Sequence, residues 1–217
     1  MSISTMLILL SQGFLVSIII FIGTLLGSLP LGIGIALMRM SAISPISYFA
    51  RIFISIMRGT PLMLQLLAIF FGPYFIFGIR LSAEWKMIAC LLAFIINYAA
   101  YFAEIYRSGL QSIPHGQIEA CQVLSYSKAQ TFRYILLPQL IKRILPAIAN
   151  EVITLVKDTS LAFVIGISEL MSEAKAISAS EVSMLPFVLA ALMYWIFNSV
   201  VERVLNRIEK EMSYYHE

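Results

Sequence analysis

The sequence predicts an all-α integral membrane protein with about five transmembrane helices. Hydrophobic residues make up 60% of the 217 residues and charged residues only 12%, whereas a soluble domain carries roughly 25% charged residues. Long uncharged runs recur along the chain. They are continuous rather than alternating, which favours helices over barrel strands. The composition excludes an ordinary soluble enzyme, and a net charge of +3 is too small to indicate nucleic-acid binding.

The predicted spans follow the uncharged runs, each close to the ~20 residues that cross the hydrocarbon core. No charge precedes Arg39, and further uncharged runs cover residues 59–79, 87–103 and 182–201. A fifth region is apolar but carries several charges. We therefore expect helices over about 10–38, 57–78, 86–108, 136–158 and 182–204, forming one transmembrane domain over residues 1–217.

The first predicted span contains the small-residue spacing Gly23-x-x-x-Gly27. Such spacing lets two helix backbones approach closely. It is compatible with packing inside one chain or with a dimer seam, and packing inside one chain is the favoured interpretation because the pattern is weakly specific.

The third predicted span carries a polar stripe. Asn97, Tyr101, Glu104 and Ser108 are spaced to lie on one helical face. A carboxylate and an amide are costly in lipid. The stripe therefore either lines a wet cavity or makes buried polar contacts with another helix.

The segment between the third and fourth spans, about 112–130, is predicted to form a short cytoplasmic helix. Pro114 can open a helix, and Ile118, Cys121 and Leu124 recur on one face. Glu119 is expected in the first turns, where the helix dipole favours an anion. The segment has no Lys or Arg before Lys128, so docking into a protein groove is favoured over lying on lipid.

The fourth predicted span holds Glu151 and Asp158, seven residues apart on one helical face, with Thr159 directly after. Charges at this depth need partners, water or a substrate. One interpretation is an internal charge network with Lys157, Arg58 or Lys142. The other is a substrate site near the middle of the membrane.

The basic residues predict an N-terminus outside and a C-terminus in the cytoplasm. Ten Lys and Arg would then lie inside and three outside. The inside set is Arg39, Arg51, Arg107, Lys128, Arg133, Lys142, Arg143, Arg203, Arg207 and Lys210, and the outside set is Arg80, Lys86 and Lys175.

Catalytic and cofactor motifs are missing from the sequence. None of the six lysines follows a glycine, so the chain has no phosphate loop of its own. The two histidines and two cysteines lack metal-ligand or disulfide spacing. We expect a non-catalytic chain without a cofactor or metal. If ATP is used, a partner chain hydrolyses it.

Several motifs together resemble one family. Glu119-Ala120-Cys121 through Ser125, followed by Ile135-Leu136-Leu137-Pro138-Gln139, resembles the EAA loop of permeases in binding-protein-dependent ABC importers. Arg58-Gly59-Thr60-Pro61-Leu62 with Gln65, and Lys157-Asp158-Thr159-Ser160-Leu161, resemble the polar amino acid branch. One residue departs from the pattern. The family usually has glycine at the position of Ser125, where it would permit a positive φ.

The resemblance implies a permease subunit in the bacterial inner membrane that works by alternating access. Its implied partners are ATPase subunits that bind ATP and Mg, a second permease copy or a paralogue, and a periplasmic or lipid-anchored solute-binding protein. The coupling residues would be Pro114, Gly116, Glu119, Ala120, Leu124 and Ser125.

An amino acid substrate has an ammonium that a carboxylate would hold and a carboxylate that Arg58 or helix N–H groups would hold. The candidate substrate-binding residues are Glu151, Asp158, Thr159 and Arg58, and the two acids on one helical face favour arginine, lysine or histidine over glutamine. The alternatives are a stand-alone secondary transporter or channel and an integral membrane enzyme. The lack of visible internal repeats and of catalytic motifs argues against both.

Overall fold

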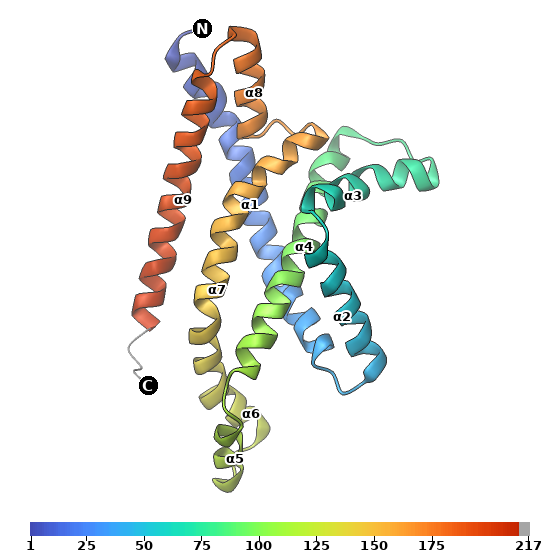
Figure 1. The fold of residues 1–217 in the computed structure, drawn as a ribbon, viewed down its shortest axis with the longest axis vertical. Coiled ribbons are helices and arrows are strands. Elements are labelled where there is room, and N and C mark those ends of the chain that lie inside the picture. Colours follow the sequence, from blue (N-terminus) through green and yellow to red (C-terminus); the bar gives the residue numbers. More distant parts are fainter. Residues whose placement is uncertain (213–217) are drawn as a thin grey trace.

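The computed structural model describes residues 1–212, and within them every regular element is a helix and there is no strand (Figure 1). The all-α class is confirmed. The last residues of the predicted cytoplasmic C-terminus, 213–217, lie outside the described part. The α-helices are α1 Ile3–Arg39, α2 Ser44–Gly59, α3 Leu62–Phe77, α4 Ala83–Gln111, α5 His115–Val123, α6 Lys128–Gln130, α7 Leu137–Asp158, α8 Leu170–Glu181 and α9 Leu185–Met212. A π-helical segment, Thr131–Leu136, precedes α7, and a 3-10 segment, Thr159–Ile165, follows it.

Within residues 1–212, three helices are long and apolar enough to cross a membrane: α1, α4 and α9. The bent pair of α2 and α3 gives a fourth candidate if it is counted as one span. The helix α7 has 22 residues, which is enough to cross, but it carries Lys142, Arg143, Glu151, Lys157 and Asp158. The fourth predicted span, 136–158, therefore stays a prediction that rests on α7.

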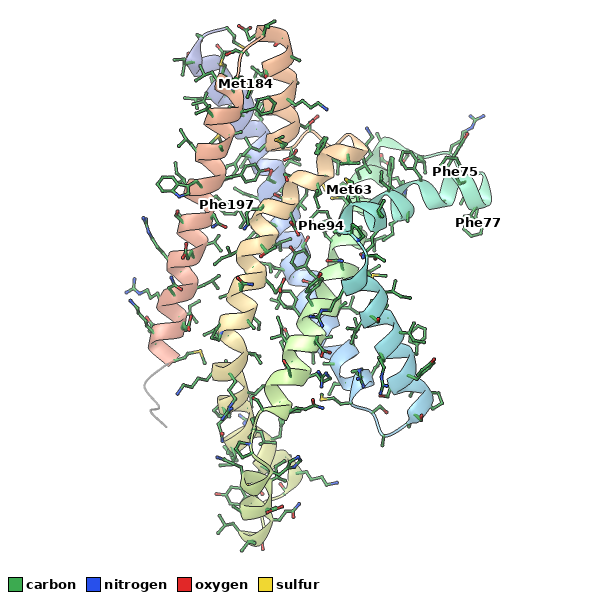
Figure 2. All side chains as sticks on the ribbon, viewed as in Figure 1. Met63, Phe75, Phe77, Phe94, Met184 and Phe197 are labelled. Atoms are coloured by element: carbon green, nitrogen blue, oxygen red, sulfur yellow. The ribbon has the colours of Figure 1, made fainter. Side chains whose placement is uncertain are left out.

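Helices α1, α2, α3 and α7 pack against α4, whereas α9 packs against α7, α8 and α1. Helix α1 contacts α4 along its length, α7 lies between α4 and α9, and α3 packs on the upper part of α4 (Figure 1). Phe94 points into this bundle, whereas Phe75 and Phe77 point outward from the projecting end of α3 (Figure 2). Helices α5 and α6 lie at the opposite end of the molecule from the N-terminus (Figure 1).

Small residues let α1 and α4 approach closely. A Cβ added to Gly23 would lie 2.8 Å from Leu91 Cδ2, and one added to Gly27 would lie 2.5 Å from Ile95 Cδ1. In lipid, close van der Waals packing replaces the hydrophobic effect as the force between helices. The interpretation of the glycine spacing as packing inside one chain is confirmed.

The structure differs from the expected span over 57–78. Two helices occupy this region, and they are bent by 108° at residues 60–61. Thr60 is extended (φ −122°, ψ 147°) because a following proline disfavours the helical conformation. Pro61 in turn has no N–H to continue the hydrogen bonding of α2. We call residues 57–65 the α2–α3 elbow.

Candidate functional site

The α2–α3 elbow is held together by two amide side chains. Met57 O accepts hydrogen bonds from Gln65 Nε2 at 2.9 Å and from Asn97 Nδ2 at 3.1 Å. Gln65 Nε2 also donates to Thr60 O at 3.1 Å and Thr60 Oγ1 at 2.8 Å. Asn97 Nδ2 donates to Gln65 Oε1 at 3.0 Å. Side chains from α3 and α4 thus satisfy carbonyls that the break in the helix leaves without backbone partners.

Asp158, the last residue of α7, is held by a tyrosine. The hydroxyl of Tyr98 donates to Asp158 Oδ2 at 2.7 Å. The donor is neutral, so this bond orients the carboxylate without cancelling its charge. Lys157 interacts with the same carboxylate electrostatically. Tyr98 was not predicted as a site residue, because a tyrosine in an apolar run usually only fills the core.

Arg58 lies at the end of α2, and its guanidinium carbon is 5.3 Å from the ring centroid of Tyr101. This is the geometry of a cation–π contact. Glu151 on α7 is half-buried and interacts electrostatically with both Arg58 and Asp158. The structure therefore brings Arg58, Glu151 and Asp158 into one electrostatic neighbourhood between α2, α4 and α7.

Thr159 is not exposed in this neighbourhood. Only 1% of its surface is accessible, and its hydroxyl donates to Val156 O at 2.8 Å within its own turn. A substrate reaches the Thr159 hydroxyl only if the 3-10 segment after α7 moves.

Helix α4 supplies the frame of the candidate site. Three of its residues, within five positions, each hold one part: Asn97 holds the elbow, Tyr98 holds Asp158, and Tyr101 holds Arg58. The ring centroids of Tyr98 and Tyr101 are 6.3 Å apart, so the residue that holds Asp158 and the residue that holds Arg58 also contact each other. The upper part of the predicted polar stripe therefore contacts other helices.

The lower part of the stripe bonds within α4. Glu104 forms an ion pair with Arg107, whose Nε donates to Glu104 Oε2 at 3.0 Å. Ser108 donates to Ile105 O at 3.1 Å. These hydrogen bonds stay within α4, although Glu104 also interacts electrostatically with Arg58.

The predicted coupling segment contains α5. Pro114 precedes the helix as its N-cap residue, and Gly116 and Ala120 are exposed. Glu119 is the fifth residue of α5, within the first two turns as expected but past the first turn, where the helix dipole is strongest. One feature differs from expectation. Leu124 is 68% exposed, because it lies at the helix end rather than on the buried face with Cys121.

The turn after α5 is closed by a Schellman motif. Tyr126 N donates to Cys121 O and Ser125 N donates to Gln122 O, both at 2.9 Å. Ser125 has φ 60°, the left-handed conformation. The turn therefore forms with serine at the position where a glycine was expected from the family resemblance.

A buried carboxylate that the sequence did not reveal joins three helices. Glu169 is 0% exposed and caps α8 by accepting from Met171 N and Ser172 N, both at 2.8 Å. It also accepts from Ser17 Oγ of α1 at 3.4 Å and from Tyr194 Oη of α9 at 3.0 Å. Glutamate is not among the preferred N-cap residues, so this capping role could not be predicted from the sequence.

Comparison with known proteins gives one consistent family. The sequence model of the family described as "Binding-protein-dependent transport system inner membrane component" matches residues 28–214. The arginine transport system permease protein ArtQ of Bacillus subtilis is 33% identical over 93% of this chain and 91% of its own length. The putative glutamine transport system permease protein GlnP of Rickettsia conorii is 31% identical over 93% and 91%.

A solved structure supports the same fold. A chain from the crystal structure of an amino acid ABC transporter with histidines superposes with a TM-score of 0.85 at 34% identity, and 94% of each chain is covered. The relatives do not favour a stand-alone secondary transporter or channel, because each is named as part of a transport system or an ABC transporter.

Proposed function

This chain belongs to the binding-protein-dependent transport system inner membrane components, as a permease of the amino acid ABC importers, and we propose that its substrate is an amino acid with a cationic side chain. The observation that carries the proposal is the pair of carboxylates, Glu151 and Asp158, on one face of α7. Two acids in a poorly hydrated site repel each other, and a cationic side chain relieves that repulsion. A neutral side chain does not.

The contacts around the carboxylates support this substrate class. Asp158 accepts a hydrogen bond from the neutral hydroxyl of Tyr98, and the guanidinium of Arg58 stacks on Tyr101. In the proposed complex, Glu151 and Asp158 hold the cationic groups of the substrate, and Arg58 binds its carboxylate. Thr159 joins only in a conformation in which the segment after α7 has moved.

We place the chain in a larger assembly. Two ATPase subunits bind ATP and Mg²⁺ and contact α5, a second permease copy or a paralogue completes the translocation path, and a solute-binding protein delivers substrate from outside. The exposure of Val123 (85%) and Leu124 (68%) supports a protein partner at α5. In this assembly, Pro114, Gly116, Glu119, Ala120 and Ser125 shape the contact, and ATP-driven movement of α5 changes the access of the site.

Transport by the purified complex in proteoliposomes tests the substrate class. The complex, with its solute-binding protein, is expected to carry arginine, lysine or histidine better than glutamine. Glu151→Gln removes one charge-assisted contact and should raise the KM for the cationic substrate by about tenfold. Glu84→Gln is the matched control, because Glu84 is exposed in the first turn of α4 and lies outside the site.

Two outcomes would contradict the proposal. If glutamine is carried well and arginine not at all, the two acids do not select a cation. If arginine transport is the same with Glu151→Gln as with Glu84→Gln, Glu151 belongs to a structural charge network.

A further inference from the structure

The α2–α3 elbow is the one bent junction between membrane-candidate helices within residues 1–212. Its break frees carbonyls at the end of α2, and three of them accept from side chains. Ile56 O accepts from Thr60 Oγ1 at 2.8 Å, Met57 O accepts from Gln65 and Asn97, and Thr60 O accepts from Gln65. At membrane depth, backbone groups without such partners cost several kcal/mol each, on the order of a lost hydrogen bond in hydrocarbon.

The two amides differ in what they connect. Gln65 comes from α3 and joins both sides of the elbow. Asn97 comes from α4, is 4% exposed, and joins the elbow to the frame helix. Together they fix the direction in which α2 ends relative to α4. Both amides donate to the same carbonyl, Met57 O, so each does more than fill space between the helices.

Arg58 follows Met57, whose carbonyl both amides hold. Its side chain reaches Tyr101, one helical turn below Asn97 on α4. The guanidinium is therefore positioned directly by its contact with the Tyr101 ring, and indirectly by the two hydrogen bonds that hold the carbonyl of Met57. Loss of those hydrogen bonds would let the end of α2 move and take Arg58 away from Tyr101 and from Glu151.

We propose that Gln65 and Asn97 are positioning residues that set where Arg58 meets the substrate. The inference rests on the proposed function, in which Arg58 binds the substrate carboxylate. It adds a specific requirement: the two amides act on substrate binding only through Arg58. Neither amide needs to touch the substrate.

A mutant cycle tests this requirement in the reconstituted complex with arginine as the probe. Gln65→Met and Asn97→Leu keep side-chain volume and remove the donors. Each is made in the wild type and in Arg58→Ala. Ser108→Ala is the matched control, because Ser108 lies on the same helix but bonds only within it.

In the wild-type background, we expect each amide variant to raise KM about five- to tenfold with less than a twofold change in kcat. In the Arg58→Ala background, the same variants should change KM by less than twofold, because the residue they position is gone. Ser108→Ala should leave both constants unchanged. A variant that is merely less well folded lowers the active fraction, and so kcat, without moving KM.

The outcomes that overturn the inference are distinct. An equal rise of KM in both backgrounds means that the amides act on substrate independently of Arg58. A fall in kcat at unchanged KM means that the elbow is structural only. If Arg58→Ala itself leaves KM unchanged, the proposed role of Arg58 fails, and the positioning role fails with it. The two amide variants are separate tests, so loss of one protein on purification leaves the other decisive.

Discussion

Ser125 holds a backbone conformation that glycine adopts at lower cost. Its φ of 60° closes the turn after α5, and an L-residue pays roughly 1 kcal/mol for this conformation. We expect Ser125→Gly to stabilise the closed turn by about 0.5–1 kcal/mol, after the greater flexibility of glycine in the open state is deducted. Hydrogen exchange of the backbone amides of residues 120–130 should then slow about two- to fivefold. Ser125→Ala keeps the Cβ and should give no slowing, and equal exchange in all three proteins would contradict the interpretation of strain.

At the same scale, the sequence revealed residues whose chemistry conflicts with their surroundings. Glu151 and Asp158 were predicted because charges inside an apolar run need a reason. Tyr98 and Glu169 were not, since an isolated tyrosine looks like core and a glutamate before a helix looks like surface. Their roles depend on which atoms of α7, α1 and α9 arrive beside them, and sequence spacing along one helix does not contain that information.

At the scale of elements, backbone atoms of α4 set how closely α1 can approach it. A Cβ on Gly32 would lie 2.9 Å from Phe102 Cβ, 3.1 Å from Ala99 O and 3.3 Å from Ala103 N. Because two of these atoms are backbone, α4 cannot yield by rotating a side chain. We expect Gly32→Ala to destabilise the protein by about 1–3 kcal/mol, measured as a lower thermal unfolding temperature in detergent.

Gly34 provides the control on the same helix, because nothing lies within 4 Å of an added Cβ. Gly34→Ala should leave the unfolding temperature unchanged or raise it slightly, as alanine favours a helix interior. Equal unfolding temperatures for Gly32→Ala and Gly34→Ala would show that the close approach does not limit packing.

Three predicted spans, 10–38, 86–108 and 182–204, coincide with helices α1, α4 and α9, because uncharged length is a strong signal in a membrane chain. The elbow did not, because the run over residues 59–79 has the length of one span and no charge to divide it. The signal was present in Thr60-Pro61, where a residue before proline leaves the helical region. What the dipeptide alone does not specify is the 108° bend, at which the amides of Gln65 and Asn97 both donate to Met57 O.

At the scale of the whole molecule, α5 lies at the opposite end from the N-terminus, as the predicted orientation requires (Figure 1). The distribution of basic residues predicts which end faces the cytoplasm, since positive charges are retained inside during insertion. The two ends of α1 offer a direct test, because Ser2 and Ala42 are both exposed and flank this single helix. If α1 crosses the membrane with its N-terminus outside, the two positions must face different compartments.

We expect Ser2→Cys, in a background with Cys90→Ala and Cys121→Ala, to react with a membrane-impermeant maleimide on intact spheroplasts. Ala42→Cys in the same background should react only after lysis. Both natural cysteines are buried, so replacing them removes slow background labelling without removing an exposed thiol. Labelling of Ala42→Cys from outside, with Ser2→Cys protected, would invert the topology. Ten of the thirteen basic residues assigned to a side would then face outward and α5 would lie outside, out of reach of any cytoplasmic ATPase.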